Sequence, residues 1–117
     1  MATKRTIKKL FKKWEWLLDW LGWKWTIYYA TNDTMPEESS EHCGMITYCD
    51  FGYLEANIYV NMDNMSQIND EDAERAVVHE LCHPLIDPMD NGTDRKLMEY
   101  TATTVSRLLY TLDKRNE

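Results

Sequence analysis

The chain has 117 residues, of which 44% are hydrophobic and 28% are charged, as is typical of one globular domain spanning residues 1–117. Its net charge of −7 is unevenly distributed, because the first thirteen residues contain six Lys or Arg and no acid. The rest is strongly acidic, which argues against nucleic-acid binding by the body of the protein. No uncharged apolar run approaches the roughly 20 residues of a transmembrane helix.

The cysteine content bears on the cellular compartment. Cys43, Cys49 and Cys82 are an odd number and contain no Cys-x-x-Cys pair. This pattern fits neither a disulfide framework nor a four-cysteine zinc site. We therefore expect a reducing, cytoplasmic environment.

The N-terminal segment predicts an amphipathic helix that ends at Gly22. Its apolar residues recur at three- and four-residue spacing, namely Ile7, Leu10, Phe11, Trp14, Leu17, Leu18 and Leu21. Trp16, Trp20 and Trp23 lie off this stripe. We favour a helix that packs onto a sheet, because so small a domain needs this apolar surface for its core. The alternative is a surface that binds a membrane or a partner protein.

Alternation of apolar and polar residues predicts three strands after this helix. The first covers about six residues from Lys24, the second runs from Cys43 to Cys49, and the third from Leu54 to Asn61. Residues 50–52, with the sequence Asp-Phe-Gly, are typical of a turn. We therefore expect residues 43–61 to form a hairpin.

Helical periodicity returns at residue 69 and predicts two further helices. The first begins at Asn69 or Asp70 and ends or kinks near Pro84, which lacks an N–H group. The second begins near Thr93 or Asp94. The residues expected to face the core are Ala73, Val77, Leu81 and Leu85 in the first helix, and Leu97, Thr101, Val105, Leu108 and Leu112 in the second. The sequence thus predicts an α+β fold with an N-terminal helix, a three-stranded, mostly antiparallel sheet and two C-terminal helices.

The most specific motif is His79-Glu80-Leu81-Cys82-His83, an HExxH sequence within the first of these two helices. Histidines four residues apart lie on the same face of a helix, so both imidazoles can bind one zinc ion. Glu80 is rotated by about 100° from His79, which places its carboxylate near the ion but outside its ligand shell. Glu80 is therefore the expected catalytic residue, acting as general base and then as general acid.

A catalytic zinc site needs a third protein ligand and an open fourth position. Glu99 is the favoured candidate, because it lies sixteen residues after His83 and early in the last helix. Two antiparallel helices would then direct both histidines and Glu99 to one point. The loop aspartates Asp87, Asp90 and Asp94 remain alternatives, although such residues more often form turns or caps.

Other zinc patterns fit less well. A metzincin would have glycine at position 86 and histidine at position 89, where this chain has Ile86 and Met89. His42, the one remaining histidine, lies far upstream on an expected strand end. Thr103, one turn after Glu99, is expected to support a metal ligand through its hydroxyl.

With this motif and a glutamate on the last helix, the chain resembles the minimal gluzincin-type zinc metallopeptidases, or minigluzincins. The resemblance covers the element order of nearly the whole chain and rests on His79, Glu80, His83 and Glu99. It implies a zincin-like fold, zinc bound by His79, His83 and Glu99, and endopeptidase activity on a peptide or protein substrate. It also implies that the strand before the active-site helix, Tyr53 to Asn61, is an edge strand that binds an extended peptide antiparallel. Pro84, directly after the second histidine, departs from the family pattern.

Two other functions remain open. Zinc would also stabilise a non-catalytic interaction module, with the Trp-rich N-terminal helix as a docking surface for a partner protein. Glu80-x-x-His83 is furthermore half of a di-iron helix-bundle motif, but the sequence has no second half and too few helices. For a peptidase, the fifteen acids and single arginine of residues 30–94 predict a preference for basic or neutral peptides.

Overall fold

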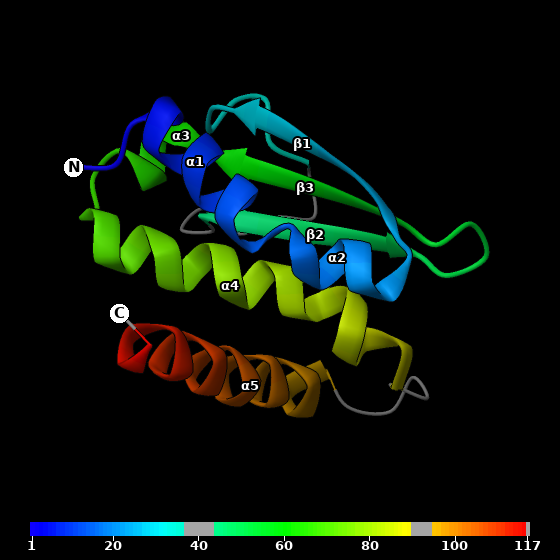
Figure 1. Ribbon diagram of the computed structural model, residues 1–117. Coiled ribbons are helices and arrows are strands. Elements are labelled where there is room, and N and C mark those ends of the chain that lie inside the picture. The colour runs from blue at the N-terminus through cyan, green and yellow to red at the C-terminus, as the bar shows by residue number, and fades with distance from the viewer. Residues whose placement is uncertain (37–43, 90–94, 117) are drawn as a thin grey trace.

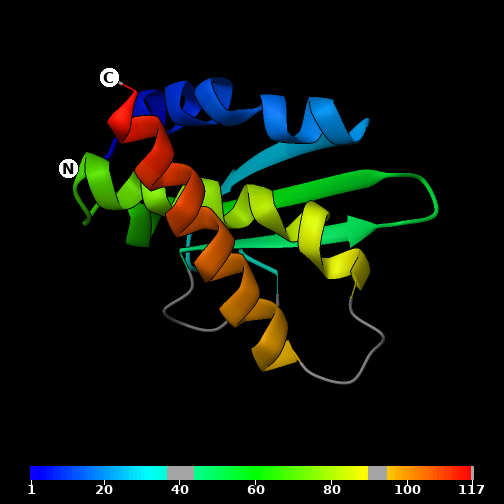
Figure 2. The same cartoon turned by 60° about the horizontal axis from the view of Figure 1, so that its bottom comes forward.

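The computed structural model describes residues 1–36, 44–89 and 95–116. Helices α1, α2 and α4 cover one face of a three-stranded sheet, and α5 packs on α4 (Figure 1, Figure 2). The elements in chain order are α1 (Lys4–Trp14), α2 (Trp16–Leu21), β1 (Lys24–Ala30), β2 (Met45–Asp50), β3 (Glu55–Asn61), α3 (Met62–Met65), α4 (Asp70–Ile86), the 3-10 helix η1 (Asp87–Met89) and α5 (Arg95–Arg115). The α+β class is confirmed. Within the described ranges, no helix has the length and apolar character needed to cross a membrane.

The sheet has the strand order β1-β3-β2, so β3 is its central strand. β2 pairs antiparallel with β3, which confirms the hairpin, but β1 pairs parallel with β3. The sheet is therefore mixed, with one parallel and one antiparallel pairing, rather than mostly antiparallel. The expectation that residues 53–61 form an edge strand is wrong, because β3 is covered by a strand on each side. The alternation of residues determines which face of a strand is buried, but it does not determine which strand is central.

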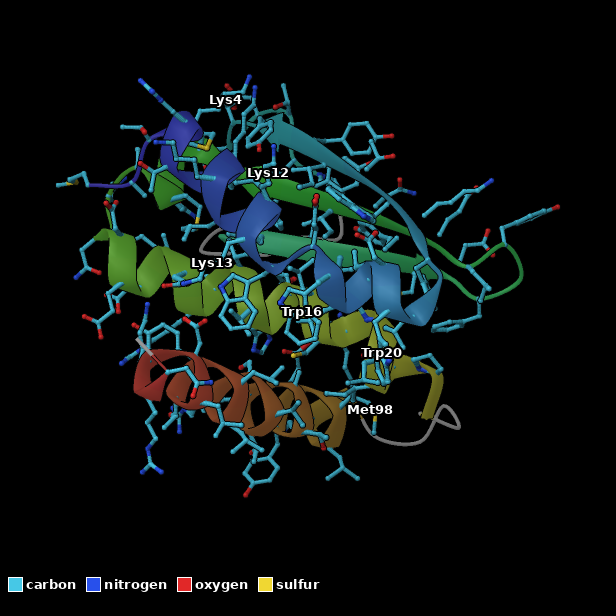
Figure 3. All side chains as sticks on the ribbon, in the orientation of Figure 1. Lys4, Lys12, Lys13, Trp16, Trp20 and Met98 are labelled. Atoms are coloured by element: carbon cyan, nitrogen blue, oxygen red, sulfur yellow. The ribbon has the colours of Figure 1, made fainter. Side chains whose placement is uncertain are left out.

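The N-terminal helix packs onto the sheet, as expected, but it is divided into α1 and α2 at Glu15. Gly22 ends α2 with a φ of 76°, a left-handed conformation that glycine adopts without strain. The predicted stripe is buried at Ile7, Phe11, Trp14, Leu17 and Leu18. Trp16 and Trp20 lie on the outer surface of α2, with 50% and 72% of their area exposed (Figure 3).

Helix α4 begins where predicted, since the side chain of Asn69 accepts a hydrogen bond from the Asp72 N–H at 2.7 Å. The helix continues two residues beyond Pro84. Proline cannot donate to the carbonyl four residues earlier, which belongs to Glu80. The Thr47 hydroxyl on β2 lies 3.4 Å from that carbonyl oxygen, and its one proton is shared between this oxygen and the Glu80 side chain, which lies closer at 3.1 Å. Pro84 therefore leaves the helix intact at the HExxH motif.

The predicted core face of α5 is only partly correct. Leu97, Leu108 and Leu112 are 52%, 58% and 46% exposed. The buried residues are instead Ala102, Ser106 and Tyr110, with further packing from Met98, Val105 and Leu109. Because α5 packs mainly on α4, only one narrow face of the helix is covered.

A buried carboxylate joins three helices. Glu74 on α4 is 5% exposed and accepts a 2.8 Å hydrogen bond from Trp14 Nε1 on α1. Its two oxygens also lie 2.8 Å from the ammonium groups of Lys13 and Lys114, at the ends of α1 and α5. Burial alone would raise the pKa of Glu74, but these hydrogen bonds and charges outweigh it and lower the pKa to about 2.

We expect Glu74→Gln to lower the free energy of unfolding by about 2 kcal/mol at pH 7, because hydrogen bonds to a charged group are lost. The folded pKa of Glu74 lies below its ordinary value of 4.5. Its stabilising contribution is therefore complete above about pH 5 and is lost as the pH falls through 4.5 towards 2. Urea unfolding measures the free energy of unfolding at pH 7 and at pH 3. The decrease between these two values should be smaller in the variant than in the wild type.

The matched control is Glu71→Gln on the same helix. The Glu71 side chain is 61% exposed and pairs only with Arg75 among the described residues, so its loss should cost at most about 0.5 kcal/mol. If acidification lowered the free energy of unfolding equally in the Glu74 variant and in the wild type, the assigned role of Glu74 would be contradicted.

Candidate metal centre

The HExxH motif brings three potential ligands together on α4. Atoms of His79, Glu80 and His83 lie within 4.8 Å of one another. The two imidazole rings are 5.1 Å apart between centroids, one helical turn from each other. Both face α5 rather than the sheet, so the predicted placement of the histidines on one face of the helix is confirmed.

Glu99 on α5 completes this cluster. Its Oε2 lies 3.2 Å from His79 Nε2, and its Oε1 lies 3.5 Å from His83 Nε2. A tetrahedral zinc ion with bonds of about 2.0–2.1 Å holds its ligand atoms about 3.3–3.4 Å apart. Each imidazole nitrogen thus lies about one ligand-to-ligand spacing from an oxygen of Glu99, and the three side chains that the sequence predicts as ligands lie together.

The second nitrogen of each imidazole also has a partner. His83 Nδ1 lies 3.0 Å from Asp87 Oδ1, and His79 Nδ1 lies 3.4 Å from the Thr103 hydroxyl. Such partners fix the orientation of a ligating imidazole. Burial opposes the charged form of His83, but the hydrogen bond and negative charge of Asp87 raise the pKa of this histidine.

The contact from Thr103 was predicted, whereas that from Asp87 was not. Asp87 lies on the far nitrogen of His83, away from the Nε2 atoms that face Glu99. The sequence does contain an indication of this contact. Asp87 lies four residues after His83, and side chains four residues apart on a helix lie next to each other. Asp87 is therefore placed to orient a ligand rather than to be one. Asp90, Asp94 and His42 lie outside the described residues.

Glu80 has a different environment from Glu99. Its side chain is buried, and Oε1 accepts a 3.1 Å hydrogen bond from the Thr47 hydroxyl on β2. Burial raises the pKa of Glu80 to about 7. Thr47 was not identified from the sequence, because it lies 33 positions before Glu80 and nothing local to either residue indicates the pairing.

Two cysteines lie near the motif. Cys82 is 1% exposed and packs in the core, as expected, and Cys49 packs against the same core from β2. Burial raises the pKa of both thiols to about 12. Both therefore stay protonated at neutral pH, whereas zinc binds the thiolate.

Comparison of the chain with protein-family models, with curated sequences and with solved structures finds no match. The function must therefore be inferred from the geometry of the site.

We expect Glu99→Gln to weaken zinc binding by about 100-fold or more, because an anionic ligand is lost, and Asp87→Asn to weaken it by about tenfold, because His83 loses its orienting carboxylate. Competition with a chromophoric chelator at pH 7 measures both affinities. Asp70→Asn, at the exposed start of α4, makes the same charge change away from the site and should leave the affinity unchanged. Zinc retention by Glu99→Gln together with zinc loss by Asp87→Asn would make Asp87 the third ligand.

Proposed function

We propose that the chain is a zinc-dependent peptidase of the gluzincin type, with His79, His83 and Glu99 as zinc ligands and Glu80 as general base. The observation that carries this proposal is the approach of both Nε2 atoms to the Glu99 carboxylate at 3.2 and 3.5 Å. When bound, zinc supplies Lewis acidity, which polarises a carbonyl group and lowers the pKa of water.

Glu80 has the properties that the proton transfers require. Burial raises the pKa of Glu80 above its ordinary value, which makes its carboxylate a stronger proton acceptor. Thr47 holds Oε1 in place, and Oε2 accepts no hydrogen bond from the described residues. We therefore assign the proton to Oε2, which takes it from water and passes it to the leaving nitrogen.

The substrate-binding strand in this proposal is β2 rather than β3. β2 lies at the edge of the sheet nearest α4, and its Thr47 contacts Glu80 directly. An edge strand presents main-chain N–H and C=O groups that pair with an extended peptide. A peptide added along β2 would pass the HExxH helix, which suits an endopeptidase.

A second candidate function is a non-catalytic interaction module that zinc stabilises. The observation that favours it is the exposure of Trp16 and Trp20 on α2, beside the basic helix α1 (Figure 3). Exposed tryptophans are enriched at protein interfaces. Zinc would then bind without peptide hydrolysis.

Glu80→Gln separates the two functions. For the peptidase, cleavage should fall by about 10²–10⁴-fold while zinc remains bound, because only the proton-transfer group is lost. Mass spectrometry of a peptide library incubated with zinc-loaded protein measures cleavage, and elemental analysis measures zinc. Glu55→Gln, an exposed residue at the start of β3, is the matched control and should retain full activity.

Cleavage that persists in the Glu80 variant would contradict the role of this residue and point to a contaminating protease. Absence of cleavage by the zinc-loaded wild type would favour the interaction module.

A further inference from the structure

A cavity of about 630 Å³ adjoins the metal centre. It lies between α4, α5 and the start of β2, and His79, Glu80 and Thr103 form part of its wall. Away from these residues it is lined by Arg75 on α4 and by Arg107 and Tyr110 on α5. The cavity thus connects the proposed reaction centre with two guanidinium groups.

Two contacts give the order of residues along this cavity. Thr103 lies 3.4 Å from His79 at the metal end, and the Arg75 guanidinium lies 4.9 Å from the centre of the Tyr110 ring at the other end. On α4, Arg75 precedes His79 by four residues, a separation of about 6 Å along the helix. An extended peptide advances about 3.3 Å per residue. The arginine end therefore lies one or two peptide residues from the metal end.

The charge of this cavity differs from that of the chain. Glu80 is the only acidic residue among the described residues that line it. Arg75 is held between the Tyr110 ring and a 3.0 Å ion pair with Glu71. Arg107 makes no ion pair or hydrogen bond with any residue in the described ranges. Its exposed guanidinium therefore meets no competing carboxylate within those ranges.

We infer that this cavity binds a substrate carboxylate one or two residues from the scissile bond, with Arg107 as its main partner and Arg75 beside it. A guanidinium binds a carboxylate through two parallel hydrogen bonds, which fixes position as well as charge. The carboxylate is either an Asp or Glu side chain within the peptide, which keeps the endopeptidase mode, or the C-terminus of the peptide, in which case cleavage removes one or two C-terminal residues instead. This inference rests on the proposed peptidase function and names the substrate class for that site.

The acidity of the whole chain predicts the opposite preference, for basic or neutral peptides. At physiological ionic strength, charges further away than about 8 Å are largely screened. Groups at contact distance are screened much less. Arg75 is already paired with Glu71 at 3.0 Å, so Arg107 decides the preference at this subsite, and more distant acids act only on other parts of the substrate.

The test is an NMR titration of the full-length ¹⁵N-labelled protein, with and without zinc. The probes are N-acetyl-tetra-alanine with a free C-terminal carboxylate, its C-terminal amide, and the amidated peptides Ac-AADA-NH₂ and Ac-AANA-NH₂. We expect at least one carboxylate probe to bind about tenfold more tightly than its uncharged partner. Preference for the free acid identifies the C-terminus as the source, and preference for the aspartate peptide identifies a side chain.

Arg107→Gln should abolish this preference, and Arg115→Gln should retain it. Arg115 is an exposed residue near the end of the same helix, outside the cavity, so both variants change the net charge equally. Equal binding of charged and uncharged probes by the wild type would overturn the inference. If both arginine variants lost the preference for the charged probe equally, the inference would also be overturned, because the preference would then be a nonspecific charge effect.

Cleavage assays with the same peptides distinguish the two proposals. Hydrolysis without any carboxylate preference would refute the carboxylate subsite and leave the peptidase function standing. Arg107-dependent binding without hydrolysis by the zinc-loaded protein would support the subsite and refute the peptidase function.

Discussion

The buried Glu74 carboxylate determines how the two C-terminal helices lie against the rest of the molecule. One side chain on α4 contacts Lys13 and Trp14 of α1 and Lys114 of α5. A buried carboxylate without these partners would carry a large desolvation cost. The ends of α1 and α5 are therefore held to α4 by the requirement to neutralise this charge.

The candidate metal centre depends on the same arrangement. Glu99 lies towards the opposite end of α5 from Lys114, and it reaches the histidines only because α5 lies beside α4 (Figure 1). Between these two ends, α5 contributes Thr103 to His79 and lines the cavity with Arg107. One helix thus brings together the proposed third ligand, a contact to the first histidine and the proposed carboxylate partner.

Two glutamates in the same site differ because of what surrounds them. Glu80 lies between α4 and β2, where burial raises its pKa to about 7. The Glu99 side chain is 45% exposed and faces two imidazole nitrogens. The first environment favours a group that gains and loses protons, and the second favours an anionic ligand. The packing of α4 against the sheet thus gives the proposed general base and the proposed metal ligand different surroundings.

Local sequence indicated most of the elements and the set of candidate metal-ligating residues, but not the break at Glu15 or the short helix α3. Helical and strand periodicity and the capping residue Asn69 depend on neighbours within a few positions, and the four-residue spacing of His79 and His83 is itself a helical property. The pairing of Glu99 with this motif followed from its place on the next helix.

The tertiary structure alone decided three features. β3 became the central strand, because strand order depends on pairing between distant segments rather than on alternation within one strand. The buried face of α5 was set by its contact with α4, so Leu97 and Leu108 remain exposed despite their helical spacing. Thr47 contacts Glu80 from strand β2, and Arg107 lines a cavity beside the candidate metal centre. These features depend on contacts between residues far apart in the chain, and local patterns in the sequence carry no record of such contacts.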